Sequence, residues 1–220
     1  MGQEINLLDL YPRSKRPVDE RGSSTTDEDR AIARRFDESF FDGDRLHGYG
    51  GFNYHPRFWE DTVKRFRDHY NLAPDARILD VGCAKGFMLY EFQKLMPDLQ
   101  LEGLDVSEYA LRTAQPAVKT YLHLGDAKEL PYEDDSFDLV ISISTVHNLA
   151  LDECSQSLME IQRVSRGNSF IYVDAWRNED ERQRFLNWNL TALTYMHRDD
   201  WIKHFADIGY DGDYYWFIAE

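Results

Sequence analysis

Short apolar runs alternate with amphipathic helical segments along the chain from residue 76 onward. The apolar runs predict strands, and most of them end at a polar residue. Between these runs, apolar residues recur at helical spacing, which predicts helices at 87–96 and around Leu158, Ile161 and Val164. Units of this length predict an α/β domain with a Rossmann-like, doubly wound and mostly parallel sheet. The predicted strands are residues 78–81, 99–105, 121–126, 138–144 and 169–174, followed by a last strand at 214–219 whose partner the pattern does not identify.

The first 75 residues have a different pattern. Residues 13–27 are polar and contain a proline and a run of serines and threonines, and residues 1–27 are predicted to form a flexible N-terminal arm. Thr25 and Glu28 fit a capping box at the start of a first helix, whose apolar positions are Ile32, Phe36 and Phe40. Residues 28–75 are therefore expected to be helical with a loop rich in glycine and aromatic residues. The Rossmann-like domain is expected at 76–220.

Composition narrows the class of protein. With 220 residues, 42% of them hydrophobic, the chain has the size of one globular domain, and no apolar run approaches the roughly 18 residues that span a bilayer. Two cysteines, no metal-site spacing and no secretory signal at residues 1–11 predict a cytoplasmic location. The net charge of −15 disfavours nucleic acid as a partner. The basic cluster in the predicted arm, open to solvent or able to hold one anionic group, is Arg13, Lys15 and Arg16.

Candidate binding residues collect at the carboxyl ends of the first three predicted strands. In a parallel sheet, ligands bind beyond these ends, where the strand order reverses. The first strand runs into the turn Asp80-Val-Gly-Cys-Ala-Lys-Gly86, whose glycines let the backbone approach a ligand closely. The second strand ends at Asp105, whose carboxylate can accept both hydroxyl hydrogens of a ribose, and the third ends at Asp126 beside Ala127, where an adenine edge would lie.

These motifs resemble those of class I S-adenosylmethionine-dependent methyltransferases over roughly residues 76–174. The matching segments are Ile78-Leu-Asp-Val-Gly-Cys-Ala-Lys-Gly86, Gly103-Leu-Asp-Val-Ser107, Gly125-Asp-Ala127 and Phe137-Asp-Leu-Val140. The resemblance implies S-adenosylmethionine as the cofactor, with S-adenosylhomocysteine as product and no metal. The cofactor-binding residues that it implies are Asp80, Gly82, Cys83, Ala84 and Gly86 at the methionine part, Asp105 and Val106 at the ribose, Asp126 and Ala127 at the adenine, and Ser142 and Ile143 after the fourth strand.

Two features of the glycine turn test this resemblance. The family usually has glycine where this chain has Ala84, which is tolerable if the backbone there keeps a negative φ. The nicotinamide-binding pattern G-x-G-x-x-G is absent, which disfavours a dehydrogenase. Cys83 has no base beside it in sequence, so we expect it to fill the loop rather than act as a nucleophile.

Candidate catalytic residues follow the fourth and fifth strands. Methyl transfer is an in-line displacement that needs alignment and, for a hydroxyl acceptor, removal of a proton. His147 could be that base or could pack over the cofactor, and Asp174 could orient the base or cap the next helix. Asn148 is a candidate for substrate contact. If His147 is not the base, the remaining candidates are Asp174, His55 and His197.

A second candidate region is the loop at 48–57. Its glycines suggest a lid that closes over the site, with Tyr49, Tyr54 and His55 offering polar tips to a substrate. The alternative is a packed aromatic loop that covers the core.

The function that these features predict is methyl transfer to a small polar metabolite. The resemblance to methyltransferases of surface-polysaccharide biosynthesis implies an oxygen of a sugar or nucleotide-sugar as the acceptor. The alternative is a non-catalytic S-adenosylmethionine-binding sensor or scaffold. The oligomeric state stays open, a homodimer included.

Overall fold

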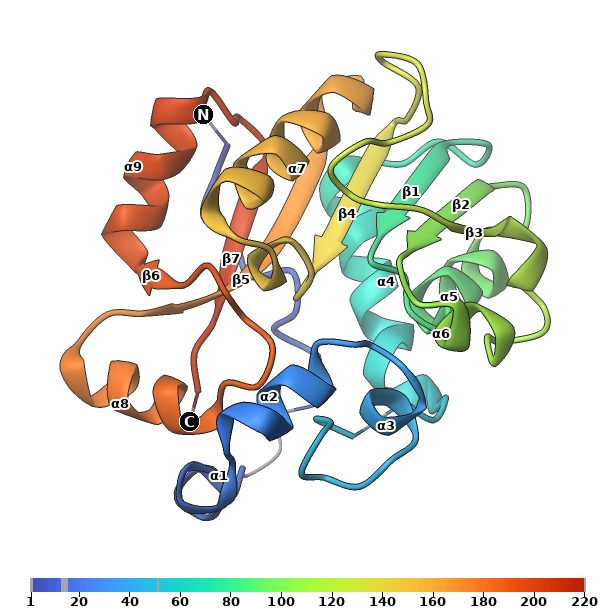
Figure 1. Ribbon diagram of the computed structural model, residues 1–220. Helices are drawn as coiled ribbons and strands as arrows, with labels where there is room; N and C mark the ends of the chain where they lie inside the picture. Colours follow the sequence, from blue (N-terminus) through green and yellow to red (C-terminus); the bar gives the residue numbers. More distant parts are fainter. Residues whose placement is uncertain (1, 13–15, 51, 220) are drawn as a thin grey trace.

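The strands form a parallel sheet in the computed structural model, which describes residues 2–12, 16–50 and 52–219 (Figure 1). The order is β3-β2-β1-β4-β5, and both β6 and β7 pair with β5. The carboxyl ends of these strands therefore lie at one edge. The strands are β1 (Arg77–Val81), β2 (Gln100–Asp105), β3 (Leu122–Leu124), β4 (Leu139–Ile143), β5 (Ser169–Trp176), β6 (Met196–His197) and β7 (Asp213–Phe217).

Helices cover both faces of the sheet and its carboxyl edge. The helices are α1 (Val18–Ser24), α2 (Asp27–Ala33), α3 (Glu38–Phe41), α4 (Pro56–Tyr70), α5 (Phe87–Leu95), α6 (Glu108–Arg112), α7 (Leu151–Val164), α8 (Glu179–Trp188) and α9 (Arg198–Ile208), with short 3₁₀ turns η1 (Lys119–Tyr121) and η2 (Val146–Asn148). In the described ranges no helix has the length and apolar character to span a bilayer. The predicted Rossmann-like α/β class is confirmed.

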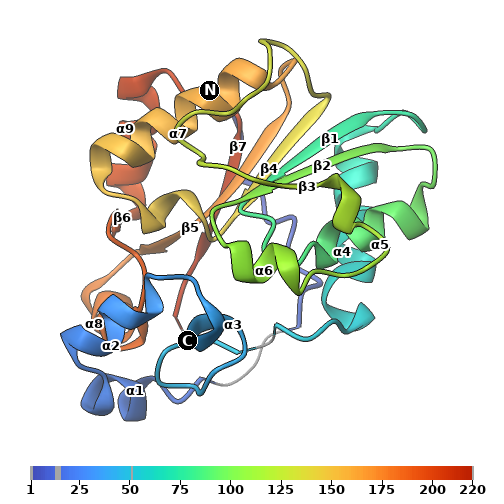
Figure 2. The ribbon, with the colours of Figure 1, turned by 45° about the vertical axis from the view of Figure 1, so that its right-hand side comes forward.

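The two cores follow from the alternation of side chains along each strand. Leu79 and Val81 point to one face, where they join a cluster with side chains of α7 and α9. Ile78 points to the other face and packs with side chains of α4 and α5. Figures 1 and 2 show these helix pairs on opposite sides of the sheet.

The last strand lies parallel to β5. Residues 213–217 pair with 170–174 in register, so the strand predicted at 214–219 exists and has β5 as its partner. On its outer edge, Tyr214 donates its N–H to the carbonyl of Gln3 and accepts from the N–H of Ile5. The beginning of the chain therefore runs along β7.

Among the residues that the structure describes, the segment predicted as a flexible arm packs against the domain. Leu7 is only 1% exposed and joins the α4–α5 core, and Val18 in α1 is buried in a cluster with Trp188 of α8. Single apolar residues spaced among polar ones carry no periodic signal, so the pattern did not reveal this packing. Arg13 and Lys15 of the predicted basic cluster lie outside the described residues.

The first helices also begin and break differently from the prediction. The capping box uses Thr26 and Asp29, one residue beyond the predicted Thr25 and Glu28, and both reciprocal bonds are present. The expected continuous helix then breaks at Phe36, whose φ is 49°. A separate helix, α3, begins after the break with Asp37 as its N-cap. The break lets the chain change direction and cross over the carboxyl ends of the strands (Figure 1).

We expect Leu7→Ala to lower the free energy of unfolding by about 2–5 kcal/mol, because it removes a fully buried side chain from a packed core. Leu10, three residues on, is 53% exposed, so Leu10→Ala should change the stability by less than about 0.5 kcal/mol. Denaturant unfolding of both variants measures the difference. Equal, small losses would mean that the first residues do not pack against the domain.

Candidate functional site

The turn between β1 and α5 has the backbone geometry of a ligand-binding loop. Gly82 has φ 84°, and a Cβ there would lie 2.0 Å from the hydroxyl oxygen of Thr145, so only glycine fits. Gly86 has φ 72° and is the N-cap of α5. The turn therefore packs against the loop after β4 at one end and leads directly into α5 at the other.

Ala84 does not meet the condition of a negative φ under which an alanine would be tolerated without strain. Its φ is 49°, in the left-handed region that costs a non-glycine residue roughly 1–2 kcal/mol. The alanine therefore stores strain in the turn instead of avoiding it. Such strain persists only where neighbouring bonds hold the backbone, as they do here.

Asp105 supplies those bonds. One carboxylate oxygen accepts the N–H of Ala84 at 2.8 Å, and the other accepts the N–H of Ser107 at 2.8 Å. Burial raises the pKa of Asp105, although these backbone N–H groups oppose the rise. Because a carboxylate has about four acceptor positions, two remain for a ligand's hydroxyl groups.

Asp80 lies beside Asp105 without a compensating cation. It is 6% exposed, and within the described chain no ion pair or hydrogen bond reaches its carboxylate. Burial, with a further contribution from the Asp105 charge, raises the pKa of Asp80 to about 7. Two buried carboxylates at one edge favour a ligand that brings positive charge and hydroxyl donors.

Cys83 is buried in the turn beside two carboxylates. Burial and the charges of Asp80 and Asp105 raise the pKa of its thiol well above the ordinary value, which leaves it protonated at neutral pH. It fills the turn, as predicted. Cys154 is also buried, on α7.

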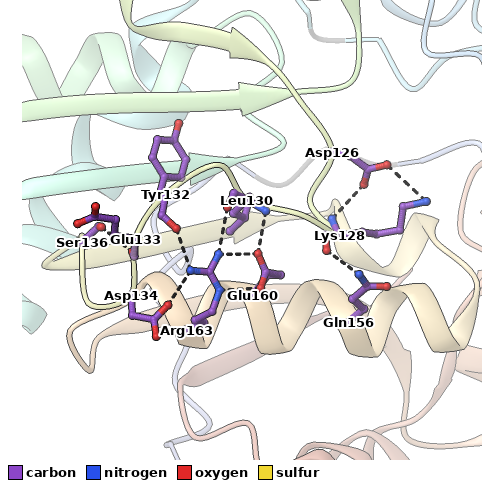
Figure 3. A network of polar contacts seen from close by, with 10 residues as sticks. All are labelled: Asp126, Lys128, Leu130, Tyr132, Glu133, Asp134, Ser136, Gln156, Glu160 and Arg163. Carbon is purple, nitrogen blue, oxygen red and sulfur yellow. Dashed lines mark hydrogen bonds and ion pairs between the residues drawn. The ribbon is translucent and has the colours of Figure 1, made fainter.

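Val106, predicted at the ribose, follows β2, and the predicted adenine residues Asp126 and Ala127 follow β3. Val106 is 53% exposed, while Ala127 is buried. Asp126 accepts the N–H of Lys128, whose ammonium group lies 3.4 Å from the other carboxylate oxygen (Figure 3). Arg163 holds the following loop to α7 through bonds to Glu160, Asp134 and two loop carbonyls.

Unpaired polar atoms gather at the end of β4. The hydroxyl of Ser142 is fully buried without a hydrogen-bond partner in the described residues, and so is the side-chain oxygen of Asn148. Ser144, one residue after Ile143, has φ 54°. Buried polar groups without partners are costly, so a bound ligand or water is expected to satisfy them.

His147 and Asp174 form a buried pair at the ends of β4 and β5. The Nε2 atom of His147 lies 3.3 Å from a carboxylate oxygen of Asp174, and both residues are less than a tenth exposed. Burial lowers the pKa of His147 against the opposing charge of Asp174, so the imidazole is neutral at pH 7. Burial likewise raises the pKa of Asp174. The Nδ1 atom of His147 has no partner in the described chain.

Of the three residues predicted from the loop at 48–57, only Tyr49 lies near the His147–Asp174 pair. The hydroxyl of Tyr49 accepts the N–H of Leu190 at 2.8 Å, and the nearby charge of Asp174 adds to burial in raising the pKa of Tyr49. Tyr54 instead donates to Glu91 on α5. His55 caps α4 through its Nδ1 atom, so neither it nor Tyr54 is directed to His147.

Two arginines that the sequence did not link to this site act on Asp174 or lie over Tyr49. The charge of Arg16 acts on Asp174, and its guanidinium carbon lies 4.6 Å from the ring of Phe217. Arg21 is buried over the ring of Trp188, at 4.4 Å, and donates to the carbonyl of Gly48 at 3.1 Å. Arg16 belonged to the predicted basic cluster, but nothing in the sequence linked it to Asp174.

A further unpredicted cluster joins the glycine turn to the helices above it. Lys85 is 5% exposed, and its ammonium group lies 2.7 Å from both carboxylate oxygens of Asp42. Tyr109 also donates to Asp42, at 2.8 Å. This cluster fastens the end of α3 to the turn and to α6.

Comparison with known proteins finds similarity to methyltransferases. Residues 78–168 match the family model described as "Methyltransferase domain". A demethylmenaquinone methyltransferase of Symbiobacterium thermophilum is 32% identical over 126 residues, which are 53% of this chain and 49% of that protein. A tRNA (carboxymethyluridine(34)-5-O)-methyltransferase of Arabidopsis thaliana is 28% identical over 133 residues, 60% of this chain and 31% of the relative.

A solved structure agrees on the fold. The crystal structure of the YcgJ protein of Bacillus subtilis has a TM-score of 0.52 and 19% identity, over 66% of each chain. At that identity the likeness concerns the fold alone. The chain spans about half the length of the first curated relative and less of the second.

We expect the stability of Asp80→Asn relative to the wild type to increase with pH. The folded-state pKa of about 7 lies above the ordinary value of about 3.9, so between them the folded protein holds a proton that the unfolded chain has lost. Wild-type stability from this group is present below about pH 4 and is lost as the pH rises through 7. Melting temperatures at about pH 5 and pH 8 test this. Asp98→Asn, an exposed control, should show a constant difference, and the same constancy in Asp80→Asn would contradict the assignment.

Proposed function

Because the chain belongs to the class I S-adenosylmethionine-dependent methyltransferases, we propose that it transfers a methyl group from this cofactor to a small polar acceptor. The observation that carries the proposal is the pair of buried carboxylates, Asp80 and Asp105, beside the glycine turn. S-adenosylmethionine brings a cationic ammonium group, a sulfonium and two ribose hydroxyls. The positive charge and the hydroxyl donors are the partners that the Asp80 and Asp105 carboxylates do not have.

The chain's own residues fit the cofactor part by part. Asp105 retains acceptor positions for the ribose hydroxyls, and Asp80 would hold the ammonium group. The exposed face of Val106 offers an apolar surface to the adenine, beside Asp126 and Ala127. The cofactor supplies the activated methyl group. Gly82, Cys83, Ala84, Gly86, Ser142 and Ile143 would complete the site.

His147 is the proposed base for an acceptor hydroxyl. A neutral imidazole protonated at Nε2, the atom that lies 3.3 Å from Asp174, would keep the Nδ1 lone pair free, and Nδ1 has no partner in the described chain. The acceptor's proton would move to Nδ1. The Asp174 carboxylate would then stabilise the imidazolium and hold the ring in place. This division of roles favours an enzyme over a non-catalytic sensor or scaffold, which needs no such pair.

The helices over the carboxyl edge would exclude water. Phe40 and Phe41 of α3 pack in one cluster with Ala84 of the turn, and Ser107 donates to the carbonyl of Phe36. This cover is larger than the predicted lid, because α2 and α3 belong to it together with Tyr49. A substrate therefore enters only if part of the cover moves.

The acceptor is proposed as a small molecule with a hydroxyl group. The names of the two relatives point to a demethylmenaquinone and to a tRNA, so they give no support to the sugar acceptor that we expected. A net charge of −15 disfavours a tRNA here. Asn148 and Tyr49 remain the proposed acceptor contacts, and the cytoplasmic location remains a prediction.

Asp105→Asn should weaken the binding of S-adenosylhomocysteine by about tenfold or more, because each charge-assisted hydrogen bond to the ribose is worth roughly 1.5–3 kcal/mol. Titration calorimetry on the purified chain measures the dissociation constant, with melting temperatures to verify folding. Asp98→Asn removes the same charge from an exposed position and should bind as the wild type does. Unchanged affinity in a folded Asp105→Asn variant would refute the ribose assignment.

His147→Ala and His147→Asn should each lower kcat by about 100-fold or more while leaving S-adenosylhomocysteine affinity within about twofold, since a general base contributes roughly 10²–10⁴-fold to the rate. The loss should shrink at high pH, where the acceptor ionises without help. Release of S-adenosylhomocysteine across pH, with an acceptor found by screening, measures this. Near-normal kcat in both variants would leave His147 a packing residue.

A further inference from the structure

A separate depression lies at the surface between α2, α8 and the segment 189–195. Its volume is about 400 Å³, within the range of small-molecule sites. Figures 1 and 2 show α2 beside α8 at the end of the molecule below the sheet. The residues that line it are Asp27, Arg30, Arg34, Leu186, Asn189, Ala192, Leu193 and Tyr195. The residues that we assign to the cofactor or to catalysis are not among them.

Two guanidinium groups are held in place at this depression. Arg30 and Arg34 are one helical turn apart, and their Nε atoms donate to the carbonyls of Asn189 and Thr191, each at 3.3 Å. Arg30 also pairs with Asp27 at 3.1 Å, on the rim. No carboxylate among the described residues lies within ion-pair distance of Arg34. The guanidinium group of Arg34 is therefore tied to the 189–195 segment by its Nε–H bond and has no carboxylate partner in the described chain.

An apolar wall stands beside these donors. Leu193 is 48% exposed and Tyr195 is 39% exposed, so two of the large exposed hydrophobic side chains of the chain line one depression. Single exposed apolar residues need no explanation, but two that face a cavity with an unpaired guanidinium are a ligand-like combination. A ligand that fits them has an anionic group and an apolar body.

We propose that this depression binds a small aromatic or similarly apolar anion, carboxylate or phosphate, through Arg34 and Arg30 on one side and Leu193 and Tyr195 on the other. The site is distinct from the proposed cofactor site. In a chain with a net charge of −15, local guanidinium groups are needed to hold an anion at all.

The depression shares a backbone segment with the candidate catalytic pair. The N–H groups of Leu193 and Thr194 donate to the carbonyl of His147, at 3.0 and 2.9 Å, and Leu190 donates to Tyr49. A ligand against Leu193 would thus contact the outer side of a segment whose inner side holds His147 and Tyr49. The binding test below does not depend on methyl transfer.

The experiment titrates the purified full chain with benzoate, phenyl phosphate and, as an uncharged match, benzyl alcohol, observed by NMR shifts of leucine methyl groups. Both anions, or one of them, should shift the Leu193 and Leu186 signals, and benzyl alcohol should bind at least fivefold more weakly. A response to phenyl phosphate alone identifies a phosphate ligand, and a response to benzoate alone a carboxylate. No saturable shift with either anion would overturn the proposal.

Variants then separate the two halves of the site. Arg34→Gln should weaken the affinity for the anion that binds by about tenfold, because it removes one charge-assisted hydrogen bond. Arg35→Gln removes the same charge one residue away, outside the depression, and should leave the affinity unchanged. Leu193→Ala should weaken the binding of phenyl phosphate or benzoate more than the binding of inorganic phosphate. Equal affinity in the wild type and Arg34→Gln, or an equal loss in Arg35→Gln, would overturn the assignment.

Discussion

The Asp105 carboxylate accepts backbone N–H groups from two loops, and this arrangement fixes how the ends of β1 and β2 meet. Its bond to Ala84 holds a left-handed alanine in the turn, and its bond to Ser107 places the residue that caps α6. Ser107 in turn donates to the carbonyl of Phe36, which anchors the cover. One buried carboxylate therefore organises the turn, the helix start and the layer above them, while retaining acceptor positions for a ligand.

The cover depends on arginine and aromatic contacts as much as on helix packing. Arg21 lies between Tyr49 and Trp188, and Lys85 joins Asp42 beneath α3. The attraction between a guanidinium group and an indole ring is stronger when water is excluded, which suits a segment that lies over a buried site. The same segment supplies part of the wall of the depression at Arg30 and Arg34, so residues of this segment contribute to both proposed binding surfaces.

The sequence patterns predicted the regular part of the structure and missed what depends on single contacts. Strands β1, β2, β4 and β5 follow apolar runs, and β2 ends at Asp105 as predicted, whereas β3 ends at Leu124, two residues before the predicted end at Asp126. The direction of β7 was not predictable, because periodicity carries no information on pairing. Leu7 and Arg21 were missed because an isolated apolar or basic residue has no signal in a polar segment. The capping box was ambiguous, since Thr25 and Thr26 are each followed by an acid three residues later.

The pairing of residues 3–5 with Tyr214 has a consequence for how the molecule behaves among its own copies. An outermost strand with free N–H and C=O groups is a template for another chain, and natural sheets cover such edges. Here both backbone groups of Tyr214 are already occupied by Gln3 and Ile5. Loss of those few residues by proteolysis would uncover the edge of β7 and favour aggregation, even with the core and the ligand sites intact.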